Sequence, residues 1–181
     1  LQEFHAASSQ RQQNFVTTMG KALEEIGFFA IENHGVDSTL IRKAYQVAEQ
    51  FFELSDEIKL RYEDPKLNGQ RGFTQFGKEH AKDHAAPDLK EFWHVGRESN
   101  LANLRSIEVP EFAAIMDELY AQLETCAMQI LEACALYLDL PRDFLSQRAI
   151  AGDTILRVIH YPPIPEAADP ASLRPAPHEK I

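Results

Sequence analysis

The amino-acid sequence predicts an α+β fold, in which amphipathic helices are interspersed with a few short apolar strands. Apolar side chains recur three and four residues apart, as on the buried face of a helix, over residues 10–26, 37–52 and 110–138. Shorter runs rich in aromatic and β-branched residues, typical of strands, cover residues 28–31, 89–95 and 154–161. Hydrophobic residues make up 44% and charged residues 25% of the 181 residues, an ordinary balance for a globular domain with a sizeable core.

The first helix is expected to end at Gly27, because glycine readily adopts the left-handed conformation that closes a helix. The run 28–31 then predicts a buried strand, and Asn33-His34-Gly35 predicts the turn that ends it. In that turn, His34 is expected to bond to the backbone. The apolar face of the helix would consist of Phe15, Met19, Leu23 and Ile26.

The second helix, over residues 37–52, can be capped by Asp37 and Ser38 and has a broad apolar stripe. A short third helix is expected to begin after Ser55 and to end before Pro65. Residues 64–87 are polar and weakly periodic, which predicts a long surface loop of a kind that is often functional. The stripe of the second helix comprises Leu40, Ile41, Ala44, Tyr45, Val47, Ala48, Phe51 and Phe52.

The longest helix, over residues 110–138, has Pro110 near its first turn and carries Cys126 and Cys134. At a rise of about 1.5 Å per residue these cysteines would lie about 12 Å apart, too far for a disulfide. We therefore expect two free, apolar cysteines in a reducing compartment, with the cytoplasm as the expected location. The last strand stops at the two prolines of residues 162–163.

The charge and hydropathy of the chain exclude several classes of protein. Its net charge is −10 and it has no basic patch, so we expect no nucleic-acid partner. It has no run of about 18 apolar residues, so we expect no membrane-spanning helix. The first residues lack the basic and apolar regions of a secretory signal. There is also no nucleophile elbow, P-loop or dinucleotide-binding glycine motif.

Three stretches in order along the chain carry a resemblance to a known family. Residues 27–36, GFFAIENHGV, are similar to the GFF-x-(I/V)-x-NHG segment of isopenicillin N synthase-like and plant-type 2-oxoglutarate-dependent dioxygenases. Residues 51–59, FFELSDEIK, look like the FF-x-LP-x-EEK segment of that family. Residues 156–163, LRVIHYPP, look like its LR-x-x-x-YP strand. Between these stretches, Gly72-Phe73 and Glu91-Phe92-Trp93 also match, which makes the resemblance fairly specific.

The resemblance implies a helical N-terminal layer packed on a double-stranded β-helix, or jelly roll. Residues 1–150 would form the N-terminal region, and residues 151–181 the opening of the jelly-roll catalytic domain, which is incomplete at its C-terminus. The implied function is that of a non-haem Fe(II), 2-oxoglutarate-dependent oxygenase, which uses molecular oxygen to hydroxylate, desaturate or cyclise a small-molecule substrate. Fe(II) is the implied cofactor. 2-Oxoglutarate is the implied cosubstrate, although isopenicillin N synthase acts without it.

The resemblance assigns a metal ligand to His178, the first residue of a His-x-Asp pair in the family. Residues two apart on a strand face the same side, so both can reach one ion. Here Lys180 stands in place of the aspartate, and a protonated ammonium group cannot ligate a metal. Glu179 would point to the opposite face unless a β-bulge re-aimed it. The second histidine ligand and the arginine for the cosubstrate lie further along in the family, whereas this chain ends at Ile181.

Three explanations of Lys180 stay open at this point. The chain is a fragment, or it is an inactive variant, or further residues separate Glu179 from Lys180 in the natural protein. The alternative function, which Lys180 supports, is that of a truncated or metal-free relative acting as a non-enzymatic binding protein. No residue is assigned a catalytic role.

Tyr161 is the candidate for cofactor binding, because the resemblance matches it to a position whose hydroxyl often contacts a carboxylate of the cosubstrate or substrate. An ordinary strand tyrosine is the equally weighted alternative. Arg157 is expected to be structural or a cation in a pocket wall. His94 could face the pocket or end its strand, and residues 71–76 could line the entrance.

His80 and His84 have the spacing of zinc ligands on a helix. Their polar surroundings and the lack of a further ligand pair favour a solvated face instead.

Overall fold

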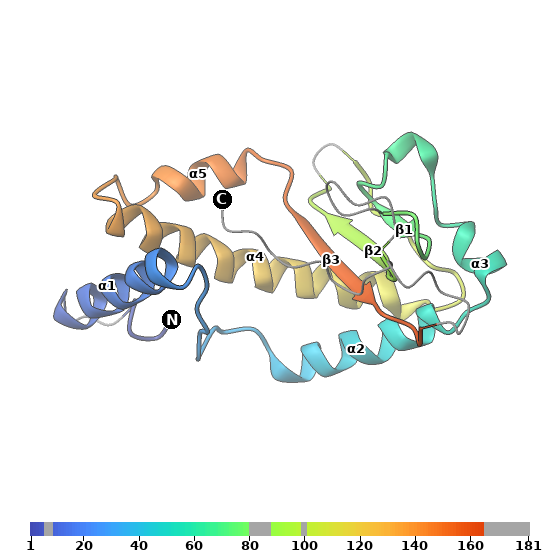
Figure 1. Ribbon diagram of the computed structural model, residues 1–181, viewed down its shortest axis with the longest axis horizontal. Coiled ribbons are helices and arrows are strands. Elements are labelled where there is room, and N and C mark those ends of the chain that lie inside the picture. Colours follow the sequence, from blue (N-terminus) through green and yellow to red (C-terminus); the bar gives the residue numbers. More distant parts are fainter. Residues whose placement is uncertain (6–8, 80–87, 99–100, 165–181) are drawn as a thin grey trace. The chain divides into compact units, whose positions relative to one another are not determined.

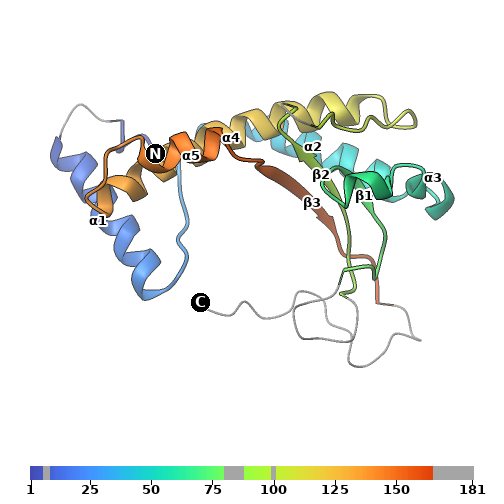
Figure 2. The same ribbon diagram turned by 90° about the horizontal axis from the view of Figure 1, so that it is seen from above.

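The computed structural model describes residues 1–5, 9–79, 88–98 and 101–164. By its internal contacts the chain divides into two units. Unit 1 comprises Leu1–Ile41 and Ala121–Asp153, and unit 2 comprises Arg42–Tyr120 and Thr154–Ile181. The helices and strands of both units are labelled in Figures 1 and 2.

Helices make up most of the described chain. They are α1 (Ser9–Glu25), α2 (Ser38–Phe52), α3 (Asp56–Leu60), α4 (Glu111–Tyr137), α5 (Phe144–Ile150) and a short 3-10 helix (Pro65–Leu67). Helices α1, α2 and α4 confirm the helices expected from apolar periodicity, and α3 confirms the short helix expected between Ser55 and Pro65. Helix α5 was not predicted, because its seven residues are too few to show a period clearly.

Three antiparallel strands form one sheet in the order β1-β2-β3, with β2 in the middle (Figures 1 and 2). The strands are β1 (Gly72–Thr74), β2 (Glu91–Gly96) and β3 (Ile155–His160). In the register of β2 with β3, Phe92 lies opposite Ile159 and His94 lies opposite Arg157. The strands expected over residues 89–95 and 154–161 are confirmed, and so is the α+β class.

The prediction of a buried strand over residues 28–31 was wrong. These residues form no strand, and Phe28 is 73% exposed. Their backbone has no strand partner among the described residues, and an extended segment becomes a strand only through hydrogen bonds to a neighbour. The flanking turns agree with expectation, since Gly27 has φ 92° and Asn33 has φ 53°. The turn also confirms the structural role of His34, whose Nδ1 accepts a hydrogen bond of 3.1 Å from the Val36 amide.

The prediction of one long surface loop over residues 64–87 was also wrong in its first half. Strand β1 and the 3-10 helix lie within it, and Arg71 is 1% exposed. The three residues of β1 are too short to give an alternating pattern, but pairing with β2 buries them. Residues 80–87, including the predicted solvated residues His80 and His84, lie outside the described residues.

In unit 1, helix α1 packs closely against the end of α4. A Cβ atom placed on Gly20 would lie 2.2 Å from the ring of Tyr137, so only glycine permits this approach. Phe4 is fully buried, and the Arg142 guanidinium lies 4.9 Å from its ring centroid. Leu23 and Ile26, which we expected on the buried face of α1, are 36% and 52% exposed. The cysteines on α4 are both free, as expected.

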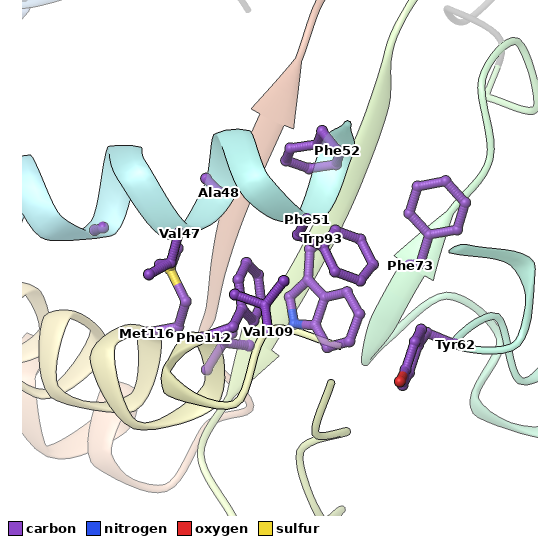
Figure 3. Packing of buried hydrophobic residues seen from close by; sticks show 12 residues of the cluster. Val47, Ala48, Phe51, Phe52, Tyr62, Phe73, Trp93, Val109, Phe112 and Met116 are labelled. Carbon is purple, nitrogen blue, oxygen red and sulfur yellow. The ribbon is translucent and has the colours of Figure 1, made fainter. Parts of the chain in front are cut away.

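In unit 2, aromatic side chains from α2, β1, β2 and α4 point toward one another and form the core (Figure 3). The Phe51 side chain is fully buried, and its ring centroid lies 4.8 Å from that of Trp93 and 5.2 Å from that of Phe112. Aromatic pairs of this kind, edge-to-face with Trp93 and tilted with Phe112, add to the hydrophobic stabilisation. Tyr45, expected in the same stripe of α2, is instead 75% exposed.

Candidate functional site

The two faces of the sheet in unit 2 have different surroundings. Side chains alternate along a strand, so Trp93 and Val95 of β2 face the aromatic core, and Phe92 and His94 face the other way. On β3, Leu156 and Val158 pack against the core, whereas Arg157 and Ile159 lie on the second face. If the alternation continues beyond the strand, the half-buried Tyr161 falls on this second face too.

A cavity of about 460 Å³, lined by both polar and apolar groups, lies on this second face. It contains both charged and aromatic side chains, the composition expected of a site that orients a small polar molecule. The described residues that line it all belong to unit 2: Glu63, Asp64, Pro65, Asn68, Gly69, Gln70, Arg71, Phe73, Thr74, Lys78, Glu79, Phe92, His94 and Arg157.

His94 and Arg157 are joined directly across the two strands. The Nε of Arg157 donates a hydrogen bond of 2.7 Å to the Nε2 of His94. Arginine is always a donor, so this Nε2 carries no proton, and the proton is on Nδ1. The Nδ1 lies 2.6 Å from the carbonyl oxygen of Gly69, to which it therefore donates. The two partners together hold His94 neutral and in one tautomer.

The guanidinium of Arg157 has two further contacts. It lies 4.3 Å from the ring centroid of Phe92, and its Nη1 is 3.1 Å from an Oε of Glu79. The same oxygen is 2.7 Å from the Nζ of Lys90, which also binds Asp88. Burial opposes ionisation of Glu79, but hydrogen bonds from Lys90 and Arg157 outweigh it and lower the pKa of this carboxyl.

The pKa of His94 is lowered, first because burial disfavours the imidazolium and then because of the nearby charges of Arg157 and Arg71. Two groups act in the opposite sense, namely the hydrogen bond to Gly69 and the charge of Glu79. The net effect agrees with the hydrogen bond from Arg157, which a protonated His94 could not accept.

We predict that the free energy of unfolding decreases as the pH is lowered below about 6.5, the ordinary pKa of histidine. The unfolded chain then binds a proton at His94 that the folded protein does not bind. The slope from this one group is at most about 1.4 kcal/mol per pH unit. The measurement is urea-induced unfolding followed by far-UV circular dichroism at about pH 7.5 and about pH 5. His94→Gln, which stays neutral at both values, should reduce the difference; an unchanged difference would contradict the prediction.

A second polar cluster lies on the core side of the same sheet. The Nζ of Lys59 is 2.8 Å from Oε2 of Glu91, and Oε1 of Glu91 is 2.8 Å from Nδ1 of His160. The side chains of Lys59 and Glu91 are only 7% and 2% exposed, whereas His160 is 39% exposed. The ring of Phe52 stacks on His160 at 5.0 Å. This cluster links α3, β2 and β3 at the end of the core and has a structural role.

The candidate residues from the sequence divide into three groups. Arg157 and His94 lie together in the cavity wall, and Arg71 and Phe73 of the expected entrance segment line it too. Tyr161 is half-buried and is not among the residues that line the cavity, so its role in cofactor binding stays a prediction. His178, with Glu179 and Lys180, lies outside the described residues.

In the parts of the chain that the structure describes, no three His, Cys, Asp or Glu side chains come close enough together to hold a metal ion. Sequence reasoning missed Glu79 and Lys59 as members of polar clusters. Each is an ordinary charged residue in its segment, and only the folded contacts distinguish it.

None of the described helices is long and apolar enough to span a membrane.

Comparison with known proteins adds a family assignment to this geometry. Residues 1–113 match the family model described as the N-terminal region of a non-haem dioxygenase in morphine synthesis. The 2-oxoglutarate-dependent dioxygenase frbA of Dothideomycetidae sp. (strain 11243) is 27% identical over 91% of the chain and 53% of its own length. The proline hydroxylase buaE of Petromyces alliaceus is 29% identical over 85% of the chain and 51% of its own length.

A solved structure agrees with these sequence matches. A 2OG-Fe(II) oxygenase family protein from Caulobacter crescentus is 36% identical, with a TM-score of 0.75, over 87% of this chain and 54% of its own. The chain thus spans about half the length of the relatives it matches. The match to the family model covers more than half of the chain. The chain therefore belongs to the Fe(II)- and 2-oxoglutarate-dependent dioxygenase family.

Proposed function

We propose that this protein is a non-haem Fe(II), 2-oxoglutarate-dependent oxygenase that oxidises a small molecule. The observation that carries the proposal is the family match over residues 1–113, which includes every described residue that lines the cavity except Arg157. The proposed catalytic fold is a double-stranded β-helix beginning near residue 151, with β3 as an opening strand and residues 1–150 as the N-terminal region. Support comes from the likeness of the described fold to a solved oxygenase of the same family.

His178 is the proposed iron ligand and Tyr161 the proposed contact to the cosubstrate. Imidazole suits iron, and a site with two histidines and one carboxylate leaves positions open for 2-oxoglutarate and oxygen. In the proposal, the protein's own contribution is to orient the substrate through the polar groups of the cavity and to exclude water with the ring of Phe92.

The test is succinate formation by the purified full chain, supplied with Fe(II), 2-oxoglutarate and air. We expect succinate to form, and we expect His178→Ala to abolish both its formation and the retention of iron after desalting. His5→Ala, a change of an exposed histidine in unit 1, is the matched control and should alter neither. A chain that retains iron and forms no succinate would contradict the proposal.

A further inference from the structure

Arg157 is held more firmly than a surface arginine on a strand would normally be. Its Nε is bound by His94, its Nη1 by Glu79, and its guanidinium plane lies on the ring of Phe92. His94 is 5% exposed and Phe92 is 3% exposed, so both supports are parts of the packed structure. A long side chain normally loses rotamer entropy when it binds a ligand, and here much of that freedom is already lost.

The held guanidinium still presents a donor group to the cavity. The side chain of Arg157 is 37% exposed, and among the described residues its Nη2 makes no hydrogen bond. Its neighbour in the cavity, Glu79, binds Nη1 at 3.1 Å, a long distance for a charge-assisted hydrogen bond. Glu79 also has a second cation, Lys90, at the shorter distance of 2.7 Å. Glu79 can therefore release Arg157 without being left unpaired.

We infer that Arg157 anchors a carboxylate group of the substrate, and that Glu79 is its counter-ion while the cavity is empty. The planar guanidinium offers two parallel N–H donors, a geometry that fits a carboxylate. An incoming carboxylate takes the place of the Glu79 oxygen at Nη1 and uses the available Nη2. That this carboxylate belongs to the substrate rests on the proposed function, whereas the binding of a carboxylate at Arg157 does not.

The positions of His94, Phe92 and Tyr161 agree with a role of Arg157 as a carboxylate anchor. His94 is a positioning residue, which fixes the guanidinium through Nε and leaves both Nη atoms for the ligand. Phe92 provides an apolar wall beneath the cation. Tyr161 follows Arg157 by four residues, roughly 13 Å along an extended chain. The anchor is thus set apart from the proposed cosubstrate contact by about the length of a small molecule.

The test uses benzoate as the probe and benzamide as its uncharged match, each titrated into the full chain. The readout is the ¹H–¹⁵N signal of the Arg157 Nε–H group, which is identified by its loss in Arg157→Lys. We expect benzoate, and not benzamide, to shift this signal with a Kd near 1 mM, a reasonable value for so small a ligand. Because Arg157→Lys removes the signal, its benzoate affinity is measured by calorimetry and should be about tenfold weaker, since lysine has no planar fork.

Glu79→Gln gives the sharper result, because it removes the competing carboxylate and should tighten benzoate binding about tenfold. Glu132→Gln is the matched control, since Glu132 also binds an arginine, Arg142, at 2.7 Å, but lies in unit 1. It should leave benzoate affinity unchanged. His94→Gln, which keeps an acceptor, should bind benzoate nearly as well as the original chain, whereas His94→Leu should not. Far-UV circular dichroism of each variant verifies that it is folded.

The inference is overturned if Glu79→Gln is folded and binds benzoate no more tightly than the original chain. It is also overturned if 2-oxoglutarate shifts the Arg157 signal and benzoate does not, because Arg157 would then bind the cosubstrate. Succinate formation without benzoate binding would support the proposed function and contradict the inference. Benzoate binding that depends on Glu79, in a chain that retains iron and forms no succinate, would support carboxylate binding at Arg157 and contradict the proposed function.

Discussion

Replacing Glu91 with glutamine is expected to lower the free energy of unfolding by about 3–5 kcal/mol. The glutamine has almost the same shape, so no cavity is created, but it removes the buried carboxylate that lies 2.8 Å from Nζ of Lys59. The remaining carboxylate at Lys59, that of Asp56 at 3.1 Å, is 89% exposed and is therefore screened by water. The side chains of Lys59 and Glu91 are both more than nine-tenths buried, and water cannot replace the lost charge. The measurement is urea-induced unfolding at neutral pH, followed by far-UV circular dichroism.

Two further variants make this prediction specific. Glu132→Gln breaks an exposed pair with Arg142 and should change stability by about 1 kcal/mol or less. The double variant Lys59→Met with Glu91→Leu removes both charges and should recover most of the loss, because an apolar pair needs no charged partner. A loss of under about 1 kcal/mol in Glu91→Gln would show that the buried Lys59 charge does not depend on Glu91.

Replacing Phe51 with alanine is the second change with a large expected effect, again about 3–5 kcal/mol. The Phe51 side chain is fully buried and its ring touches those of Trp93, Phe112 and Phe73 (Figure 3). Truncation removes its transfer free energy and leaves a cavity that these rings cannot fill without giving up their own contacts. Urea-induced unfolding is again the measurement, and the slope of the transition shows whether the unfolded states are comparable.

Tyr45→Ala is the control for this second prediction. Tyr45 is a large aromatic residue on the same helix, α2, but it is 75% exposed. Its removal should change stability by about 0.5 kcal/mol or less. Equal losses in the two variants would mean that helix propensity, and not burial, decides the stability of α2.

The long elements were predictable from the sequence because their apolar periods are strong. Helices α2 and α4 repeat that period over several turns, and the expected bounds differ from the observed ones by one residue at most ends. Residues 28–31 were misread because an apolar aromatic run predicts a strand only if a partner lies beside it. Strand β1 was missed for the opposite reason, since its burial comes from β2 and not from its own three residues.

The candidate site was predictable in part. The family resemblance identified the strand that carries Arg157 and the segment that carries Arg71 and Phe73, and the structure brings all three into one cavity wall. The link from Arg157 to Glu79 joins residues 78 positions apart, and no local pattern encodes it. The roles of His178 and Tyr161 stay predictions.

The burial of Trp93 has a practical consequence for following the protein in solution. It is the single tryptophan of the chain, and it is 1% exposed in the core of unit 2. Its intrinsic fluorescence therefore reports on the packing of unit 2, whereas unit 1 contributes no tryptophan emission. Circular dichroism, in contrast, is dominated by helices whose residues are shared between both units. Emission and ellipticity recorded on one sample thus separate cooperative unfolding of the whole chain from unfolding one unit at a time.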